Sequence, residues 1–174
     1  MTRPEEILQE KVAKYLVCNY PNILFHSDYG SGAKLGKGQA AKQKRQNGGR
    51  RAWPDMFIAQ PSTDGEMKFD PHPRPINDDG IALSMVVTLP RVYAGLFLEL
   101  KKEGEALFPG PRAQKRFRSK DGLEYRTQHF MEQADVLYAL RQRGYYAVFA
   151  IGFEEAISYI TAYLGEPPKQ EIEF

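Results

Sequence analysis

The sequence contains one cysteine, three histidines and no apolar run long enough to cross a membrane. A lone cysteine, Cys18, cannot form an internal disulfide, and it fits a reducing, cytoplasmic setting. A membrane span requires about 20 consecutive apolar residues, and the N-terminus also lacks the apolar core of a signal peptide. His26, His72 and His129 are too scattered to indicate a zinc site or a histidine-centred catalytic site.

Nucleotide-binding signatures are also missing. Gly30 and Gly32 begin a dinucleotide fingerprint, but Leu35 stands where the third glycine is required, and no Gly-Lys-Ser or Gly-Lys-Thr of a phosphate-binding loop occurs. A chain of 174 residues with 42% hydrophobic and 12% aromatic residues predicts one folded domain that buries about 70% of its unfolded surface. We expect this domain to span residues 1–165, with an insertion at 60–92 and a polar tail at 166–174.

A glycine-rich segment between Tyr29 and Pro54 contains seven of the 24 basic residues and none of the 22 acidic ones, although the whole chain has a net charge of only +2. A basic segment on an otherwise acidic chain indicates a polyanionic partner. A merely solvated loop is the alternative. We predict that the segment contacts DNA through its basic residues, which are Lys34, Lys37, Lys42, Lys44, Arg45, Arg50 and Arg51.

The hydrophobic pattern predicts a mixed α/β domain with a central sheet flanked by helices. The predicted order is α-β-β-β-α-β-α. The insertion at 60–92 lies between the first and the third strand and contains the second. The three helices are expected at about 4–18, 128–143 (capped by Thr127) and 154–164. The four strands are expected at 56–59, 81–89, 94–101 and 145–151.

Carboxylates stand at the ends of two of these predicted strands. Asp55 follows Pro54 at the start of one apolar run, and Glu99 and Lys101 close another. Because side chains alternate along a strand, Glu99 and Lys101 share a face. If the strands pair antiparallel, Asp55 meets both. Two carboxylates can hold a hard divalent cation, and a neighbouring lysine can act on the attacking water or stabilise a phosphorane.

Each part of this pattern also has a purely structural explanation. Pro-Asp is a common turn dipeptide, and Glu-x-Lys is a common solvent-facing pair on edge strands. The first helix offers a further candidate because Glu5 and Gln9 fall on the stripe formed by Leu8 and Val12. A core-facing Glu5 needs a partner such as a metal ion or its hydration shell. Thr2 and Glu5 also fit a helix capping box, so both interpretations of Glu5 stay open.

Taken together, these motifs resemble the PD-(D/E)XK nuclease superfamily and, within it, the VRR-NUC branch. The resemblance rests on Trp53-Pro54-Asp55, on Leu98-Glu99-Leu100-Lys101, on Glu5 and Gln9 in the first helix, and on Gln128 at the start of a later one. It implies a restriction-endonuclease-like sheet in which Asp55, Glu99 and the Leu100 carbonyl ligate Mg²⁺ or Mn²⁺. Lys101 would assist the water, Glu5 would ligate directly or through water, and Gln128 would order the site or contact DNA.

The expected function is a metal-dependent DNA endonuclease that selects DNA structure rather than sequence, because phosphate contacts give affinity without sequence information. Members of the branch include bacterial and phage enzymes, some of them dimers that act on branched DNA, so a Holliday-junction-like substrate, a role in repair or recombination and a homodimer are expectations from the resemblance. Two alternatives remain: a catalytically inactive nucleic-acid-binding module, and a protein-interaction subunit that docks through the acidic, proline-rich insertion.

Overall fold

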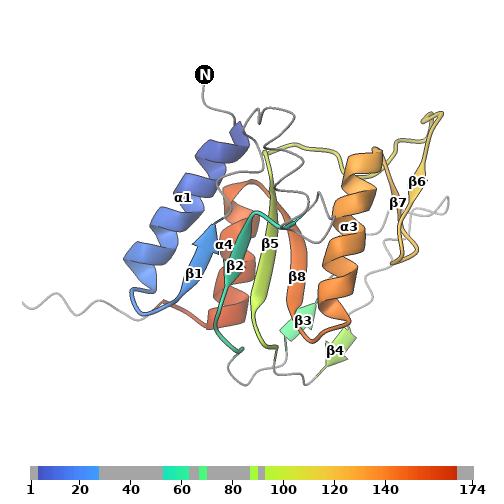
Figure 1. Cartoon of the computed structure of the whole chain (residues 1–174). Coiled ribbons are helices and arrows are strands. Elements are labelled where there is room, and N and C mark those ends of the chain that lie inside the picture. The colour runs from blue at the N-terminus through green and yellow to red at the C-terminus, as the bar shows by residue number, and fades with distance from the viewer. Residues whose placement is uncertain (1–3, 28–52, 63–66, 70–86, 90–92, 168–174) are drawn as a thin grey trace, which may run out of the picture.

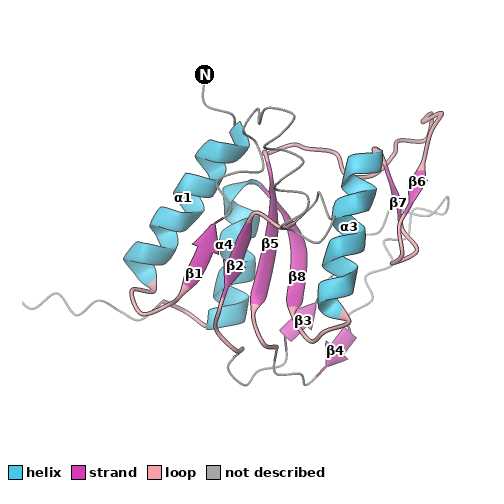
Figure 2. Cartoon of the chain, in the orientation of Figure 1, coloured by secondary structure: helices cyan, strands magenta, loops and turns pink. Residues whose placement is uncertain are grey.

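In the computed structural model, residues 4–27, 53–62, 67–69, 87–89 and 93–167 are described. A four-stranded mixed sheet forms the centre, with strand order β1-β2-β5-β8. Helices α1 and α4 cover one face of this sheet and α3 covers the other (Figures 1 and 2). The predicted mixed α/β architecture is therefore confirmed.

Two of the core strands pair antiparallel, which is the condition under which the sequence analysis expected Asp55 to meet Glu99. β2 (Met56–Ile58) pairs antiparallel with β5 (Leu96–Lys101). β5 in turn pairs parallel with β8 (Tyr146–Ile151), and α3 lies in the connection between them. A parallel pair requires such a crossover, and a helix is its usual form. β1 (Phe25–Ser27), which pairs antiparallel with β2, was not predicted.

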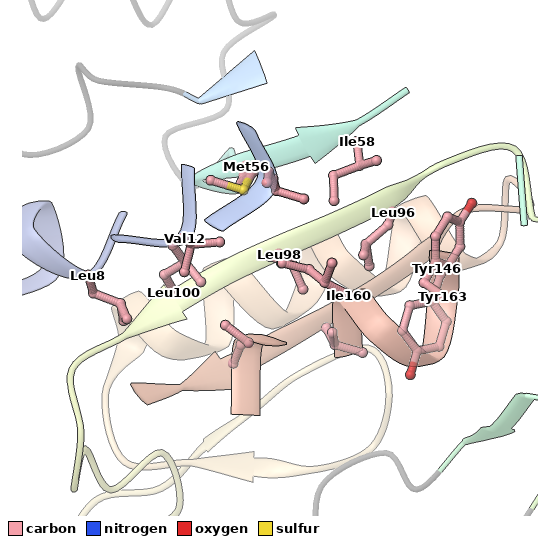
Figure 3. Packing of buried hydrophobic residues seen from close by; sticks show 14 of the residues in the cluster. Leu8, Val12, Met56, Ile58, Leu96, Leu98, Leu100, Tyr146, Ile160 and Tyr163 are labelled. Atoms are coloured by element: carbon pink, nitrogen blue, oxygen red, sulfur yellow. The ribbon is translucent and has the colours of Figure 1, made fainter. Parts of the chain in front are cut away.

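α1 (Pro4–Asn19) packs through residues spaced four apart. Leu8, Val12 and Leu16 are buried, as the helical period predicts. They contact the face of β5 formed by alternate residues, as Figure 3 shows for Leu96, Leu98 and Leu100. α4 (Gly152–Leu164) completes this side of the core and begins two residues before its predicted start.

α3 (Gln128–Arg141) covers the opposite face of the sheet. The Thr127 side chain accepts a hydrogen bond from the Phe130 backbone N–H at 3.1 Å, so Thr127 caps the helix as predicted. Gly144 follows the helix with a φ of +84°, a conformation that suits glycine and lets the chain turn back into the sheet. Phe97 of β5 and Phe149 of β8 are buried against this helix.

Two small two-stranded sheets accompany the central sheet. β3 (Met67–Phe69) pairs with β4 (Val87–Leu89), so the part of the predicted 81–89 strand that is described is extended. The remainder of the insertion and the tail beyond 167 lie outside the described residues. β6 (Phe117–Arg118) and β7 (Glu124–Tyr125) form a hairpin that was not predicted. No helix in the described ranges combines the length and the apolar character needed to cross a membrane.

Candidate active site

The start of β2 lies beside the end of β5, and this brings Asp55 to Glu99. Met56 pairs with Leu98 in the antiparallel register, so Asp55, one position before, stands opposite Glu99, one position after. The Asp55 Oδ2 accepts a hydrogen bond from the Leu100 backbone N–H at 2.8 Å, which fixes the carboxylate across the two strand ends. The predicted convergence of these two carboxylates is confirmed.

The two faces of β5 have different roles. Leu98 and Leu100 point into the core beneath α1 and α4, whereas Phe97 packs on the α3 side. Because side chains alternate along a strand, Glu99 and Lys101 lie on the α3 side with Phe97. The sequence prediction that Glu99 and Lys101 share a face is therefore correct.

Glu99 is a buried carboxylate with a relative exposure of only 2%. Its Oε1 accepts hydrogen bonds from Lys101 Nζ at 2.8 Å and from Gln133 Nε2. Burial and the nearby charge of Asp55 raise the pKa of Glu99 well above its usual range, and the Lys101 ammonium only partly opposes them. The site therefore holds two carboxylates whose ionisation is mutually unfavourable.

Lys101 is also buried, with an exposure of 4%. Its Nζ lies 5.6 Å from the centre of the Phe130 ring, within the range of a cation–π contact. Burial alone would lower the pKa of the Lys101 ammonium, but the negative charges of Glu99, Asp55 and Glu5 outweigh it and raise that pKa. Lys101 therefore stays protonated at neutral pH.

Gln9 ties the first helix to the strand ends. Its Nε2 donates hydrogen bonds to Ser27 Oγ at 2.7 Å and to the Asp55 backbone carbonyl at 3.1 Å. The side chain is buried at 8% exposure, consistent with its predicted place on the buried stripe. Through these bonds α1, the end of β1 and the start of β2 hold one another in position around Asp55.

Glu5 and His129 border the same site. Glu5 is exposed in the first turn of α1, so the expectation that its place on the stripe turns it to the core is wrong. Its charge nevertheless acts on both Lys101 and His129. Burial and the nearby Lys101 ammonium lower the pKa of His129, which favours the neutral imidazole. Ligation of a metal ion by Glu5, directly or through water, stays a prediction. Thr2 of the alternative capping box lies outside the described residues.

The glutamine that contacts Glu99 is Gln133, not Gln128. Gln128 is exposed, and its Nε2 donates to Glu132 Oε1 at 3.0 Å on the outer surface of α3. The structure therefore does not bring Gln128 to the carboxylates, and a contact with DNA stays a prediction for it. A signal for Gln133 existed, because Gln133 lies three residues after Phe130 on the apolar stripe of α3, where a polar side chain requires a partner.

Two buried oxygens in this cluster lack a hydrogen-bond partner: Glu99 Oε2 and Gln133 Oε1. A buried carboxylate oxygen without a partner is costly, and a bound cation is one way to satisfy it. In the described ranges no third His, Cys, Asp or Glu side chain completes a metal-holding group with Asp55 and Glu99. The donor set nevertheless fits Mg²⁺, which commonly binds through one or two carboxylates together with water and substrate phosphate. Ligation by the Leu100 carbonyl stays a prediction.

The predicted DNA-contacting loop lies outside the described residues. Its seven basic residues are Lys34, Lys37, Lys42, Lys44, Arg45, Arg50 and Arg51.

The fold of this chain is similar to that of a known protein. No family model matches this chain, and no curated protein matches it. A solved structure named "VRR_NUC domain protein" is similar over 96% of this chain and 93% of its own, with 20% sequence identity and a TM-score of 0.52. The likeness extends over nearly the whole of both chains, and it supports the VRR-NUC fold that the sequence motifs predicted.

Proposed function

We propose that this chain is a metal-dependent DNA endonuclease with Asp55, Glu99 and Lys101 at its centre. The observation that carries the proposal is the buried Glu99 carboxylate, which faces Asp55, keeps one oxygen without a partner and binds Lys101. Strongly perturbed carboxylates beside a lysine are typical of catalytic sites. The fold shared with a protein named for its VRR_NUC domain supports the same function.

Asp55 and Glu99 would hold Mg²⁺ or Mn²⁺. When bound, such an ion offsets charge on a phosphate and makes a coordinated water more acidic. Its positive charge would also relieve the repulsion between the two carboxylates. Gln133 would keep Glu99 in its rotamer, and the Leu100 N–H would keep Asp55 turned toward it. These supporting bonds hold the first ligands rigidly, as an efficient site requires.

Lys101 would act as a fixed positive charge. Because its pKa is raised, it is poorly suited to remove a proton at neutral pH. It is well suited to hold a water molecule or to stabilise the extra negative charge that develops on the phosphate oxygens. In the hydrolysis, the water oxygen forms a bond to phosphorus and the bond from phosphorus to the leaving sugar oxygen breaks. The leaving oxygen gains a proton, and the products are a phosphate monoester and a hydroxyl end.

We extend the proposal to the substrate. Cleavage selective for branched DNA, such as a four-way junction, is expected over sequence-specific cutting, because contacts between basic residues and phosphates carry no base information. The basic loop at 34–51 is the predicted source of such contacts. A homodimer would supply two active sites for the two strands, out of four, that must be cut to resolve such a junction.

The test is cleavage of labelled linear, flapped and four-way DNA in the presence of Mg²⁺ or of EDTA. Asp55→Asn and Lys101→Met keep the size of the side chains, and each should reduce Mg²⁺-dependent cleavage by at least about 100-fold without abolishing DNA binding. Lys14→Met, on the exposed side of α1, is the matched control and should cleave normally. A site variant that unfolds at the same temperature as the parent chain and still cleaves DNA at the parent's rate would contradict the proposal.

A further inference from the structure

A second basic stretch of the sequence, at 112–126, forms the β6–β7 hairpin and the loop that enters it; we call this stretch the hairpin region. This hairpin region has six basic residues and two acidic ones, whereas the other described residues have seven basic and twelve acidic ones. All six cations are exposed. They are Arg112, Lys115, Arg116, Arg118, Lys120 and Arg126. Within the described part of the chain, positive charge is thus concentrated on one small, exposed region, and the other described residues are acidic overall.

The two acidic residues of the hairpin region offset little of this charge. Asp121 points inward, where it accepts hydrogen bonds from the Leu123 backbone N–H at 2.9 Å and the Tyr125 hydroxyl at 3.1 Å, and it lies 3.6 Å from the Arg141 guanidinium. Glu124 is exposed and pairs with Arg116 at 3.1 Å. The outward surface of the hairpin region therefore presents six cations and one carboxylate.

The hairpin is firmly attached to the domain. Tyr125 is 2% exposed, and its ring packs against those of Phe108 and Phe149. The Lys120 backbone N–H donates to Asp135 Oδ1 of α3 at 2.7 Å, which fixes the turn of the hairpin alongside the middle of that helix. A preorganised surface binds with less loss of conformational entropy than a loop that must order on binding.

The loop that enters the hairpin region lies at the same end of the domain as the candidate active site. The chain enters it from the end of β5, which carries Glu99 and Lys101, and leaves it into the N-terminal end of α3. Figure 1 shows the loop before β6 at the same end of the molecule as the end of β5 and the beginning of α3. Phe130, whose ring lies under the Lys101 ammonium, is four residues beyond Arg126.

We propose that the hairpin region is a DNA-backbone surface that holds a duplex arm beside the candidate active site. That the partner is DNA rests on the proposed function. The surface itself is distinct from the predicted DNA-contacting loop at 34–51, which is a separate part of the sequence. Arg112 and Lys115 in the entering loop have no ion pair with any described residue, so binding a phosphate would break no existing contact. Each such contact releases a counterion from the DNA and adds about 0.9 to the salt dependence of binding.

The test measures binding rather than cleavage. Fluorescence anisotropy with a labelled duplex in EDTA gives the dissociation constant between about 50 and 200 mM NaCl for the full chain and for Arg112→Gln/Lys115→Gln. Loss of two phosphate contacts should flatten the log–log salt slope by about 1.8, so the rise in Kd over this fourfold range of salt should be about 12-fold smaller.

Lys14→Gln/Arg143→Gln is the matched control, because both residues are exposed and lie in α1 and beyond the C-terminal end of α3, away from the hairpin region. It removes the same charge and should leave the slope unchanged. Equal effects of the two double variants, an unchanged slope in Arg112→Gln/Lys115→Gln, or no DNA binding by the parent chain would overturn the proposal. Displacement of the duplex by polyglutamate at equal charge concentration would do so as well, since it would indicate an acidic protein partner. DNA binding with the expected slope but no cleavage in Mg²⁺ would contradict the proposed hydrolysis and leave this surface in place.

Discussion

Replacement of Glu99 by glutamine should stabilise the metal-free protein at neutral pH while removing the proposed activity. Glu99 is buried, faces the charge of Asp55 and has an oxygen without a partner. These features raise its pKa well above the ordinary value of 4.5. Glutamine has nearly the same shape, accepts the same hydrogen bond from Lys101 and has no charge to desolvate.

The pH dependence follows from the direction of this shift. Near pH 4 Glu99 is largely neutral in both the folded and the unfolded chain, so the two proteins should differ only through packing. As the pH rises above 4.5, the unfolded chain loses the proton and the folded chain keeps it, so the native protein loses stability. The loss is about 1.4 kcal/mol for each pH unit until the pH reaches the folded pKa of Glu99, and it stays constant above that value.

The Glu99→Gln variant lacks this loss. Its free energy of unfolding relative to the parent should therefore increase from about pH 4 upward and level off once the pH passes the folded pKa of Glu99, which lies well above its ordinary value. Urea unfolding at a series of pH values measures the difference directly. Glu10→Gln, an exposed change on α1, is the control and should stay within about 0.5 kcal/mol of the parent throughout.

Added Mg²⁺ should reverse the order of stability, so that the parent becomes more stable than the Glu99→Gln variant. An ion that binds only the folded parent stabilises it by about 2.7 kcal/mol at a concentration 100 times its Kd, and the Glu99→Gln variant should gain much less. A stability difference that does not change with pH would refute the reasoning about the Glu99 pKa. Equal stabilisation of both proteins by Mg²⁺ would refute the proposed place of the metal.

Two further substitutions test the support of the site and of the sheet. Gln133→Ala removes the amide that holds Glu99, so it should lower Mg²⁺ affinity or the cleavage rate by about 10- to 100-fold. Titration of the cleavage rate with Mg²⁺ measures both quantities. A change of less than twofold would show that the contact is dispensable. Gly95→Ala would place a Cβ atom 2.6 Å from the Phe57 ring and 2.9 Å from the Ile58 carbonyl oxygen. Because both distances are too short, the variant should be less stable by about 1–3 kcal/mol in urea unfolding. A variant as stable as the parent would contradict the close packing at Gly95.

The strands that form the core could be predicted because their residues are apolar on both faces. β5 is buried at every position and β8 at all but its last, so long apolar runs identify both strands without any need for alternation. β1, β6 and β7 have only two or three residues and include exposed or charged side chains. Such segments contain too little periodicity to distinguish them from loops, and tertiary contacts decide their conformation.

The candidate site could be predicted only in part, for related reasons. Asp55 stands at the start of one strand, and Glu99 and Lys101 stand at the end of another. Their convergence could therefore be expected on the condition that the two strands pair antiparallel, as they do. Gln133 lies on a helix whose face toward the sheet depends on how the helix packs. The sequence pattern therefore pointed to Gln128 at the start of the helix. The glutamine that contacts Glu99 is Gln133, about one and a half turns later.

The energetics of the cluster argue that it is maintained for function. A core selected only for stability gains little from a buried ion pair, because apolar residues of similar volume at such positions are often equally or more stabilising. Here the chain instead buries Glu99 and Lys101, sets Asp55 against them and leaves two polar oxygens without hydrogen bonds. Gln9 and Gln133 then hold this unfavourable arrangement in place from two different helices. An unfavourable local arrangement that neighbouring residues hold in place is expected where a bound ligand completes the site. The proposed divalent cation would supply the positive charge that offsets the two carboxylates.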